Sequence, residues 1–388
     1  MQSHSAKEAE AEGYMKSGKK HSEKTLFHFK ANYNSAAEDF DKAARIYANL
    51  SNYPMARDAW TRASEAHQKA HNDFNAANSM EKLGDFIAQY MVESQSSASS
   101  GGAKPIGEHL YEEAIRSYEA ASTLYGAATN GLKQAAALKK VADLVSRMLA
   151  AAKYSRPGIG GAGAAAATAV DTARLQKEYK RIVPEVIALM ERNWEATESK
   201  PFDLPDIYRS YMLFCLRAGD IEGAVQTEKR MIGIVSTSPA DGTYDDSKNL
   251  FRVLNQPTNA AKAGLEIIVL CLSTSVDDGY TWANIEMGRL GAVFGFCSSS
   301  EERAAAALLA AYADRDEEAL QEALKVNSCF NFLAADVSRL AKKLTLGAKG
   351  RPKETGTAAA SVAAGRAAPA SSTQAPVDAS ETDEDDLR

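Results

Sequence analysis

Apolar and small residues recur at spacings of three and four along the first 150 residues of the chain. One stripe runs from Tyr33 to Tyr47, and the same phrase restarts at Tyr53. Such spacing puts residues on one face of an α-helix, whereas a half-buried strand alternates every second residue. The pattern predicts amphipathic helices whose alanines allow close backbone approach while aromatic side chains fill the gaps. Between the tyrosines, the two stripes contain Ala36, Ala37, Phe40, Ala43 and Ala44, then Ala56, Ala59, Trp60, Ala63 and Ala66.

Further stripes start at Phe74, Tyr111 and Leu132. Apart from one interruption, a new helix therefore begins about every twenty residues, which gives about forty residues per helical pair. This period is typical of repeat proteins in which each helical hairpin buries its apolar face only against its neighbours. We therefore predict an all-α fold, a tetratricopeptide-like (TPR-like) α-solenoid of antiparallel helical hairpins.

Turn-forming residues separate the predicted helices. "SNYP" at 51–54 combines a cap with a proline near a helix start, and "HND" at 71–73 supplies turn formers. Gly219 and Asp220 predict a turn between helices at 202–218 and 221–235.

The helical pattern continues from residue 258 to about residue 346. "AGLEIIVLCLST", which starts at Ala263, is too short to span a membrane and predicts a buried helix. Ser299 or Ser300 is expected to cap a later helix. This part of the chain should form a C-terminal helical bundle.

Composition divides the chain further. Two segments rich in Gly, Ser and Ala, at 93–109 and 155–170, are predicted to be insertions between helices. The predicted organisation is an N-terminal helix at 1–24, an apolar loop at 25–32, repeats at 33–257, the bundle at 258–346, and a disordered linker with an acidic tail at 347–388.

Bulk charge and cysteine content exclude several classes of function. The net charge of −6 over 388 residues argues against general nucleic-acid binding, which depends on neutralising phosphates. Four scattered cysteines, Cys215, Cys271, Cys297 and Cys329, contain no C-x-x-C pair and predict mostly buried thiols in a reducing compartment. The first twenty residues lack the apolar core of a signal peptide, so a cytoplasmic location is expected.

Three features in their order along the chain resemble one known family. They are the helix "KEAEAEGYMKSGKK" followed by "TLFHF", the phrase "YNSAAEDFDKAARIYANLSNYPMARDAW", and the C-terminal "DEDDLR". Together they are similar to the soluble NSF attachment proteins, the SNAP family. The similarity is strongest over residues 7–90, weaker over 108–150 and 200–345, and clear again in the last residues. The "DLR" end favours the α-like branch and "FKANYNSAAEDF" favours the γ-like branch, so the branch stays open.

The resemblance implies an adaptor of membrane fusion. Proteins of this family wrap the four-helix SNARE bundle in several copies and recruit the hexameric AAA+ ATPase NSF, which pulls the bundle apart. The implied partners are therefore the SNARE bundle, the NSF ATPase and, weakly, the membrane surface. No cofactor is implied.

The resemblance also carries residue roles. Leu26, Phe27 and Phe29 match an exposed apolar loop that dips into the membrane, although an apolar loop is otherwise often packed against the next helix. The acidic C-terminal residues match those that contact and stimulate the ATPase, whereas composition alone predicts a solvated tail. These C-terminal residues are Asp383, Glu384, Asp385, Asp386 and Leu387.

Basic residues on the repeat helices are the candidates for binding the acidic SNARE bundle through salt-sensitive contacts. Lys139 and Lys140 in "ALKKVADL" best match a basic position of the family, whereas Glu113 and Ala136 stand where some members have lysine. A charge on a helix is usually only part of a solvated face. The complete candidate set is Arg57, Arg62, Lys82, Arg116, Lys133, Lys139 and Lys140.

Other motifs predict no chemistry of their own. His67 and His71 are four residues apart but lack further metal ligands, so we expect helix-surface histidines. "GIGGAG" lacks the strand and the Lys-Ser/Thr that a phosphate loop needs. Asp277 and Asp278 are expected to form a turn and a helix cap, and no nucleophile–base set is found. We expect no enzymatic activity.

Two alternatives remain open. A generic TPR scaffold would bind partner tails through a clamp of Lys, Arg and Asn in its groove and would not need Leu387 or the "LFHF" loop. A helical enzyme would have its site in residues 200–345, and a perturbed, buried carboxylate there would favour it.

Overall fold

The computed structural model describes residues 4–23, 31–98, 108–154, 171–197, 199–235 and 242–346. Within these ranges it has fifteen α-helices, one 3₁₀-helix and one two-stranded sheet, so the prediction of an all-α fold is confirmed apart from that small sheet. Residues up to Leu346 form one unit. The predicted membrane loop, the insertion at 155–170 and the tail at 347–388 lie outside the described residues.

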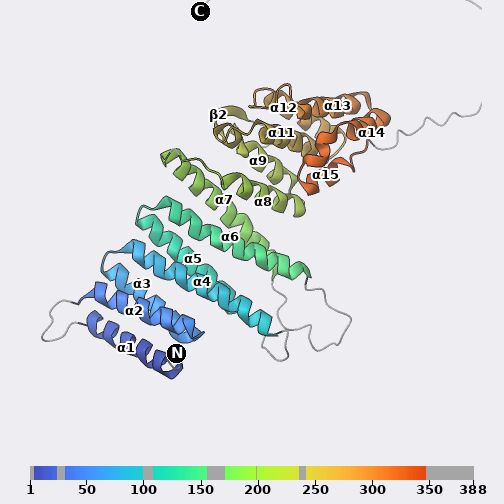
Figure 1. The fold of residues 1–388 in the computed structure, drawn as a ribbon. Helices are drawn as coiled ribbons and strands as arrows, with labels where there is room; N and C mark the ends of the chain where they lie inside the picture. Colours follow the sequence, from blue (N-terminus) through green and yellow to red (C-terminus); the bar gives the residue numbers. More distant parts are fainter. Residues whose placement is uncertain are drawn as a thin grey trace, which may run out of the picture. The chain divides into compact units, whose positions relative to one another are not determined.

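The first seven helices follow one another in space in the order of the sequence, and each packs against the next (Figure 1). Short turns join α2 to α3 and α3 to α4, so these neighbours run antiparallel. The bounds are α1 His4–Ser22, α2 Tyr33–Asn49, α3 Tyr53–Lys69, α4 Asp73–Ala98, α5 Glu108–Ala127, α6 Gly131–Tyr154 and α7 Thr172–Thr197.

The turns between these helices have the predicted chemistry. Asn52 caps α3 by accepting a hydrogen bond from the Met55 amide at 3.4 Å, and Pro54 lies in the first turn. Asn72 accepts a bond from the Asn75 amide at 3.2 Å at the start of α4. The predicted turns at 51–54 and 71–73 are confirmed.

The alanine and aromatic stripe forms the core of this part. The four central alanines of α2 are completely buried, and Phe40 is 3% exposed. A Cβ atom at Gly18 would lie 2.7 Å from the Phe40 ring, so α1 can approach α2 only because this residue is glycine. The predicted helix starts at Phe74 and Leu132 are right to within one residue, but these two residues do not belong to the buried stripe. Phe74 is 41% and Leu132 is 62% exposed, because each is the second residue of its helix and precedes the first buried position.

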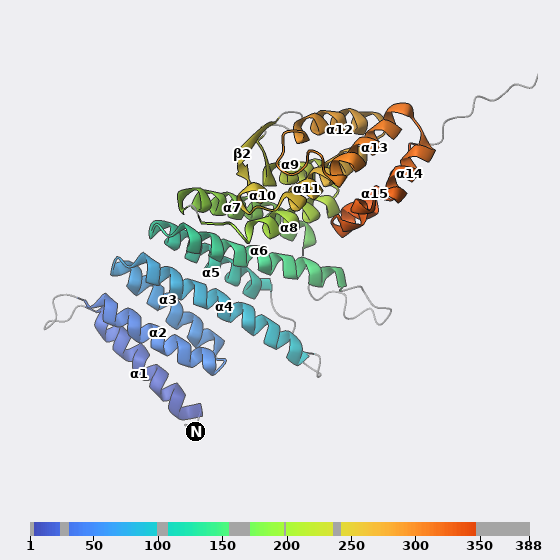
Figure 2. The same cartoon turned by 45° about the horizontal axis from the view of Figure 1, so that its top comes forward.

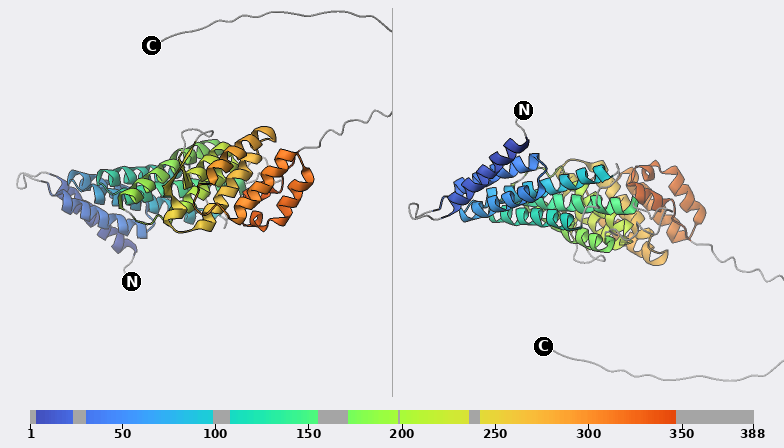
Figure 3. Two further views of the ribbon diagram at one scale, coloured as in Figure 1. Left: turned by 90° about the horizontal axis from the view of Figure 1, so that it is seen from above. Right: turned by 90° about the horizontal axis from the view of Figure 1, so that it is seen from below.

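The second part of the chain is organised around α11, of which the residues from Ala263 to Leu272 are all buried. It packs against α9, α12, α13 and α15, which confirms the predicted buried helix (Figure 2). Figure 3 shows α13 to α15 at the end of the unit remote from α1. The bounds are α8 Leu204–Arg217, α9 Ile221–Met231, α10 Leu250–Val253, α11 Pro257–Leu272, α12 Asp277–Leu290, α13 Ser300–Asp314, α14 Glu317–Val326, η1 Ser328–Phe332 and α15 Ala335–Ala341.

The predicted helix at 221–235 is wrong in its last turn. The helix ends at Met231, and β1 Ile232–Val235 pairs antiparallel with β2 Thr243–Asn249. Gly233 has a φ of 82°, and a Cβ there would lie 2.5 Å from the Asp245 carbonyl oxygen. A left-handed glycine ends the helix, and the β-branched residues around it continue as a strand.

Other local predictions have mixed outcomes. The predicted insertion at 93–109 is too long, because α4 continues to Ala98 and α5 begins at Glu108. Ser299, rather than Ser300, caps α13. At the start of α12 the Ser275 hydroxyl accepts the capping bonds, and Asp277 lies in the first turn. No helix among the described residues combines the length and apolar character that a membrane span requires.

Candidate interaction surface

The seven basic candidates lie on α3 to α6 but not on one surface. Ion pairs link helices two places apart in the sequence, so these helices form two rows. Arg57 on α3 pairs with Glu113 on α5, which places this pair on the row of α3, α5 and α7. Lys140 on α6 pairs with Asp85 on α4, on the other row. A single flat patch that contains all seven candidates is therefore not formed.

A charged cluster joins α4, α5 and α6, and we call it the Glu81 cluster. Lys140 Nζ lies 2.7 Å from Glu81 Oε1 and 2.8 Å from both carboxylate oxygens of Asp85. The Tyr125 hydroxyl donates to Glu81 at 2.6 Å, and the Tyr118 hydroxyl donates to Asp85 at 2.9 Å. Lys140 therefore bridges two carboxylates that each hold a tyrosine from the intervening helix.

The environment of Glu81 keeps its carboxyl ionised. Burial alone would raise the pKa of Glu81, but the Lys140 ammonium and the Tyr125 hydroxyl outweigh it and hold the pKa below its ordinary value. Burial would lower the pKa of Lys140, and bonds to Asp85 and Glu81 raise it instead. Both partners are thus charged at neutral pH and joined across two helices.

Lys133 also faces the Glu81 cluster. Its Nζ atom is 4.0 Å from Glu81 and 5.9 Å from the centre of the Tyr125 ring. An acidic partner that recruited Lys133 or Lys140 would have to compete with the carboxylates already present. The main role of the Glu81 cluster is therefore to hold α4, α5 and α6 together.

Three other candidates have weaker attachments. Arg62 pairs with Asp58 at 2.8 Å, and Lys139 pairs with Asp143 at 3.0 Å, each on its own helix. Arg116 is exposed and donates to the backbone oxygen of Glu112 at 3.3 Å. Exposed pairs within one helix are worth only about 0.3–0.5 kcal/mol. A partner carboxylate can therefore displace them at little cost. The remaining candidate, Lys82, is half-buried on α4.

The row of α3, α5 and α7 has a charge ladder that sequence reasoning missed. Glu113 accepts from Tyr53 at 2.6 Å besides its pair with Arg57. Arg174 on α7 pairs with Glu112 at 2.7 Å, and Arg181 pairs with Glu119. The acidic face of α5 is thus matched to basic residues on both neighbours. The sequence contained one signal for this ladder, Glu113, which the sequence analysis treats only as a departure from the family pattern.

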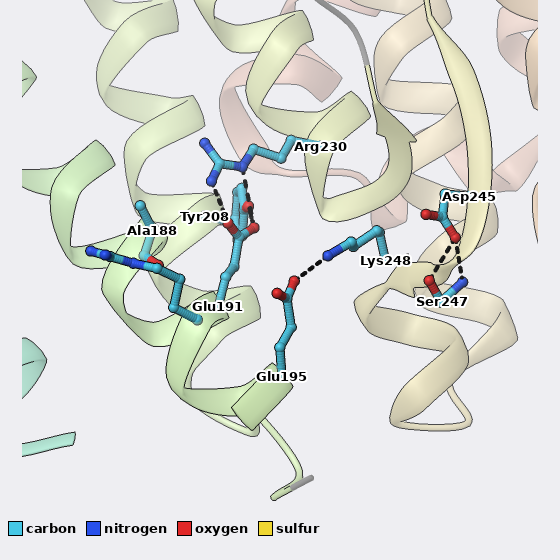
Figure 4. Close-up of polar contacts among 9 residues, drawn as sticks. Ala188, Glu191, Glu195, Tyr208, Arg230, Asp245, Ser247 and Lys248 are labelled. Carbon is cyan, nitrogen blue, oxygen red and sulfur yellow. Dashed lines mark hydrogen bonds and ion pairs between the residues drawn. The ribbon is translucent and has the colours of Figure 1, made fainter. Parts of the chain in front are cut away.

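A second network attaches α7 to the helices that follow it (Figure 4). Glu191 on α7 accepts hydrogen bonds from Tyr208 on α8 and from Arg230 on α9. Burial and the charge of Glu191 raise the pKa of the Tyr208 hydroxyl. Glu195, one turn further along α7, pairs with Lys248 on β2. These contacts hold α8, α9 and β2 to a single helix.

Buried charges lie in the second part of the chain. Lys229 Nζ and Glu286 Oε1 are 2.9 Å apart, and neither side chain is exposed to solvent. Glu286 also accepts from Arg289 at 2.7 Å and from Trp282 at 3.3 Å. This ion pair joins α9 to α12, and all three donors contact Glu286 Oε1, while Glu286 Oε2 is buried without a hydrogen-bond partner among the described residues.

Two further glutamates, Glu228 on α9 and Glu266 on α11, are also completely buried. Glu266 accepts from the Ala334 amide at 2.6 Å, which ties the segment before α15 to α11. Burial, followed by the charge of Glu266, raises the pKa of Glu228 well above its ordinary value. Glu228 therefore holds a proton at a pH at which an exposed glutamate has lost it.

A perturbed, buried carboxylate in residues 200–345 was the feature expected of a helical enzyme, and Glu228 and Glu266 both have it. Their geometry argues for a structural role instead, because a general acid or base must reach its substrate and these side chains have no exposed surface. The grooves described below are lined by α6, α7 and α8 and the turn preceding α8, and neither glutamate contributes to them.

The predicted histidine pair does not lie on one helix. His67 is buried, with Nε2 3.5 Å from Asp41 Oδ2, and the Ser79 hydroxyl donates to the same aspartate at 3.0 Å. His71 lies beyond the end of α3 in the turn, with a φ of 57°. The expectation of two surface histidines is therefore wrong for His67. In the ranges that the structure covers, no cluster of three or more His, Cys, Asp or Glu residues is arranged to hold a metal ion.

Several sequence-predicted residues cannot be placed. Leu26, Phe27 and Phe29 of the apolar loop, and Asp383 to Leu387 of the tail, lie outside the described residues. Of the four cysteines, Cys215, Cys271 and Cys329 are buried and Cys297 is exposed, which confirms the prediction of mostly buried thiols.

No protein-family model matches the chain, and no curated protein matches it significantly. The similarity to the SNAP family therefore rests on the sequence features quoted above.

Proposed function

We propose that this chain is an adaptor of the membrane-fusion machinery that binds SNARE bundles laterally and recruits the NSF ATPase. In this proposal α1 is the N-terminal helix, the elements from α2 to α10 form a TPR-like α-solenoid, and the elements from α11 onward form the C-terminal helical bundle. ATP hydrolysis belongs to the partner. The chain would be cytoplasmic, with weak peripheral attachment to the membrane through Leu26, Phe27 and Phe29.

The observation that supports the proposal best is the ordered packing of α1 to α7, each helix on the next. An array of this kind offers a long surface with many modest contacts, as binding along a four-helix bundle requires. Affinity would then come from several copies around one bundle rather than from one deep site.

The contacts of the basic candidates refine their roles. Among the described residues, Lys139, Arg62 and Arg116 have partners only within their own helix, so they are the residues that we expect to meet an acidic partner. Lys133 and Lys140 would act mainly through the Glu81 cluster, by keeping the helices in register. At the other end of the chain, Leu387 and its acidic neighbours would contact the ATPase.

The second candidate, a generic TPR scaffold, requires basic side chains that are available inside a groove. Two basic residues line the groove between α6 and α8, and of these two only Lys139 has a pair that a partner carboxylate could displace at little cost. Lys139 pairs with Asp143, and Arg217 pairs with Asp336 at 2.7 Å. No observation therefore favours a carboxylate clamp over SNARE binding.

Equilibrium binding to a pre-formed SNARE four-helix bundle tests the proposal. The double variant Arg116→Glu/Lys139→Glu should weaken binding at least about fivefold in 0.1 M salt, because each reversal removes an attraction and adds a repulsion. The control Lys325→Glu/Lys342→Glu makes the same charge change at two exposed positions remote from α3 to α6. Lys325 lies on α14, and Lys342 directly follows α15. It should change binding by less than twofold. Absence of bundle binding by the unmodified chain would refute the proposal.

A further inference from the structure

Two adjoining grooves of about 550 and 330 Å³ share Ser146, Tyr179 and Ser210, so they form one continuous trough. α7 supplies its floor, and α6 and α8 supply its walls. The lining runs from Lys139 to Ala150 on α6. At 1.5 Å per residue this wall is about 17 Å long, which is the length of a helix of about eleven residues. We call this feature the α6–α8 trough.

The trough has the surface that a helix needs in order to dock. Leu149 on α6 and Leu213 and Phe214 on α8 line the trough and are half-buried, and Phe214 packs against Tyr179 with ring centres 4.6 Å apart. The lining residues of α8 recur at spacings of three and four, so they present one face of that helix to the trough. Apolar groups at such spacing receive the i, i+3, i+4 and i+7 side chains of an amphipathic helix.

The unpaired charge of the trough is negative and lies at one end. Asp203 and Asp206 line that end at the start of α8, and both are exposed. Asp203 occupies the cap position of α8, but its side chain makes no capping bond. Among the described residues neither carboxylate has an ion-pair partner. Arg217 at the opposite end is held by Asp336.

We propose that the α6–α8 trough binds a helical segment of another protein, with apolar residues on one face and Lys or Arg in its terminal turn. The apolar face would pack on Leu149, Leu213 and Phe214, and the basic turn would meet Asp203 and Asp206. This partner differs in charge from the acidic SNARE bundle, so the inference stands apart from the proposed function.

Two fluorescein-labelled helical peptides of fifteen residues test the inference by fluorescence anisotropy. Both carry leucines at i, i+3, i+4 and i+7, and their terminal turns contain three Lys in one peptide and three Glu in the other. The Lys peptide should bind at least tenfold more tightly than the Glu peptide. Asp203→Asn/Asp206→Asn should weaken the Lys peptide between about twofold and about thirtyfold, the range expected for losing two exposed ion pairs.

A second variant tests the location. Ser210→Trp fills the middle of the trough and should weaken the Lys peptide at least tenfold. Thr281→Trp, an equally bulky change at an exposed position on α12, should have no effect. Equal binding of the two peptides, or full binding by Ser210→Trp, would overturn the inference.

Other occupants would be recognised by different results. If the Lys peptide binds only after residues 155–170 are replaced by a short Gly-Ser linker, the chain itself fills the trough and the inference fails. A dimer in sedimentation equilibrium that Ser210→Trp dissociates would assign the trough to a second copy, and would also overturn it.

Discussion

Lys140→Met isolates the contribution of the Glu81 cluster to stability. The substitution keeps the length of the side chain but removes the ammonium that contacts Glu81 at 2.7 Å and Asp85 at 2.8 Å. Breaking a buried pair costs about 3–5 kcal/mol, whereas an exposed pair contributes about 0.2–1 kcal/mol. The Glu81 side chain is 11% exposed, but that of Lys140 is 34% exposed, and Lys133 remains near Glu81. We therefore expect an intermediate loss of about 1–2 kcal/mol.

Urea unfolding of Lys140→Met and Lys139→Met measures this loss with a matched control. Within the part of the chain that the structure describes, Lys139 pairs only with Asp143 on its own helix, so its loss should cost less than about 0.5 kcal/mol. The pKa of Glu81 is lowered in the folded protein, so its stabilisation is present above the ordinary pKa of glutamate and disappears as the pH falls. The difference between wild type and Lys140→Met should shrink accordingly below about pH 4. Equal losses for the two variants at pH 7 would refute the inter-helix role of Lys140.

Three further predictions concern the second part of the chain. The pKa of Glu228 is raised in the folded protein, so the contribution of Glu228 to stability should fall as the pH rises above 4.5. In urea unfolding, Glu228→Gln should therefore gain stability relative to wild type from pH 5 to pH 8, and a constant difference would contradict the buried proton. Lys229→Met leaves Glu286 buried and should cost about 3 kcal/mol or more, while Lys229→Met/Glu286→Leu should recover at least half of that loss in the same assay. Gly233→Ala places a Cβ against a backbone oxygen at positive φ and should cost about 1–3 kcal/mol by thermal unfolding, whereas an unchanged melting temperature would contradict the left-handed strand start.

The helices could be predicted where local periodicity determines them. The stripes that begin at Tyr33 and Tyr53 start the observed α2 and α3, because Asn32 and Asn52 cap both helices and alanines face inward. The strand β1 was missed because four apolar residues after a helix fit either structure. Only its pairing with β2 decides between them.

The charge networks could be predicted only in part. Periodicity indicates which face of a helix Lys140 occupies, but not that Asp85 lies opposite on a helix two places earlier. Because the sequence does not show this contact, the sequence analysis treats Lys140 as a basic residue available to a partner. One signal was available and unused: Glu266 interrupts a continuous apolar run in a helix predicted to be buried, which indicates a buried carboxylate with a specific partner.

Stimulation of the NSF ATPase on pre-formed SNARE bundles tests the adaptor role most directly. ATP hydrolysis and bundle disassembly should both rise when the full chain is added, and Leu387→Ala should lose most of that stimulation while still binding the bundle. Equal stimulation by the variant would contradict the assignment of the tail alone. If the full chain neither recruits the ATPase nor promotes disassembly, the adaptor role is wrong.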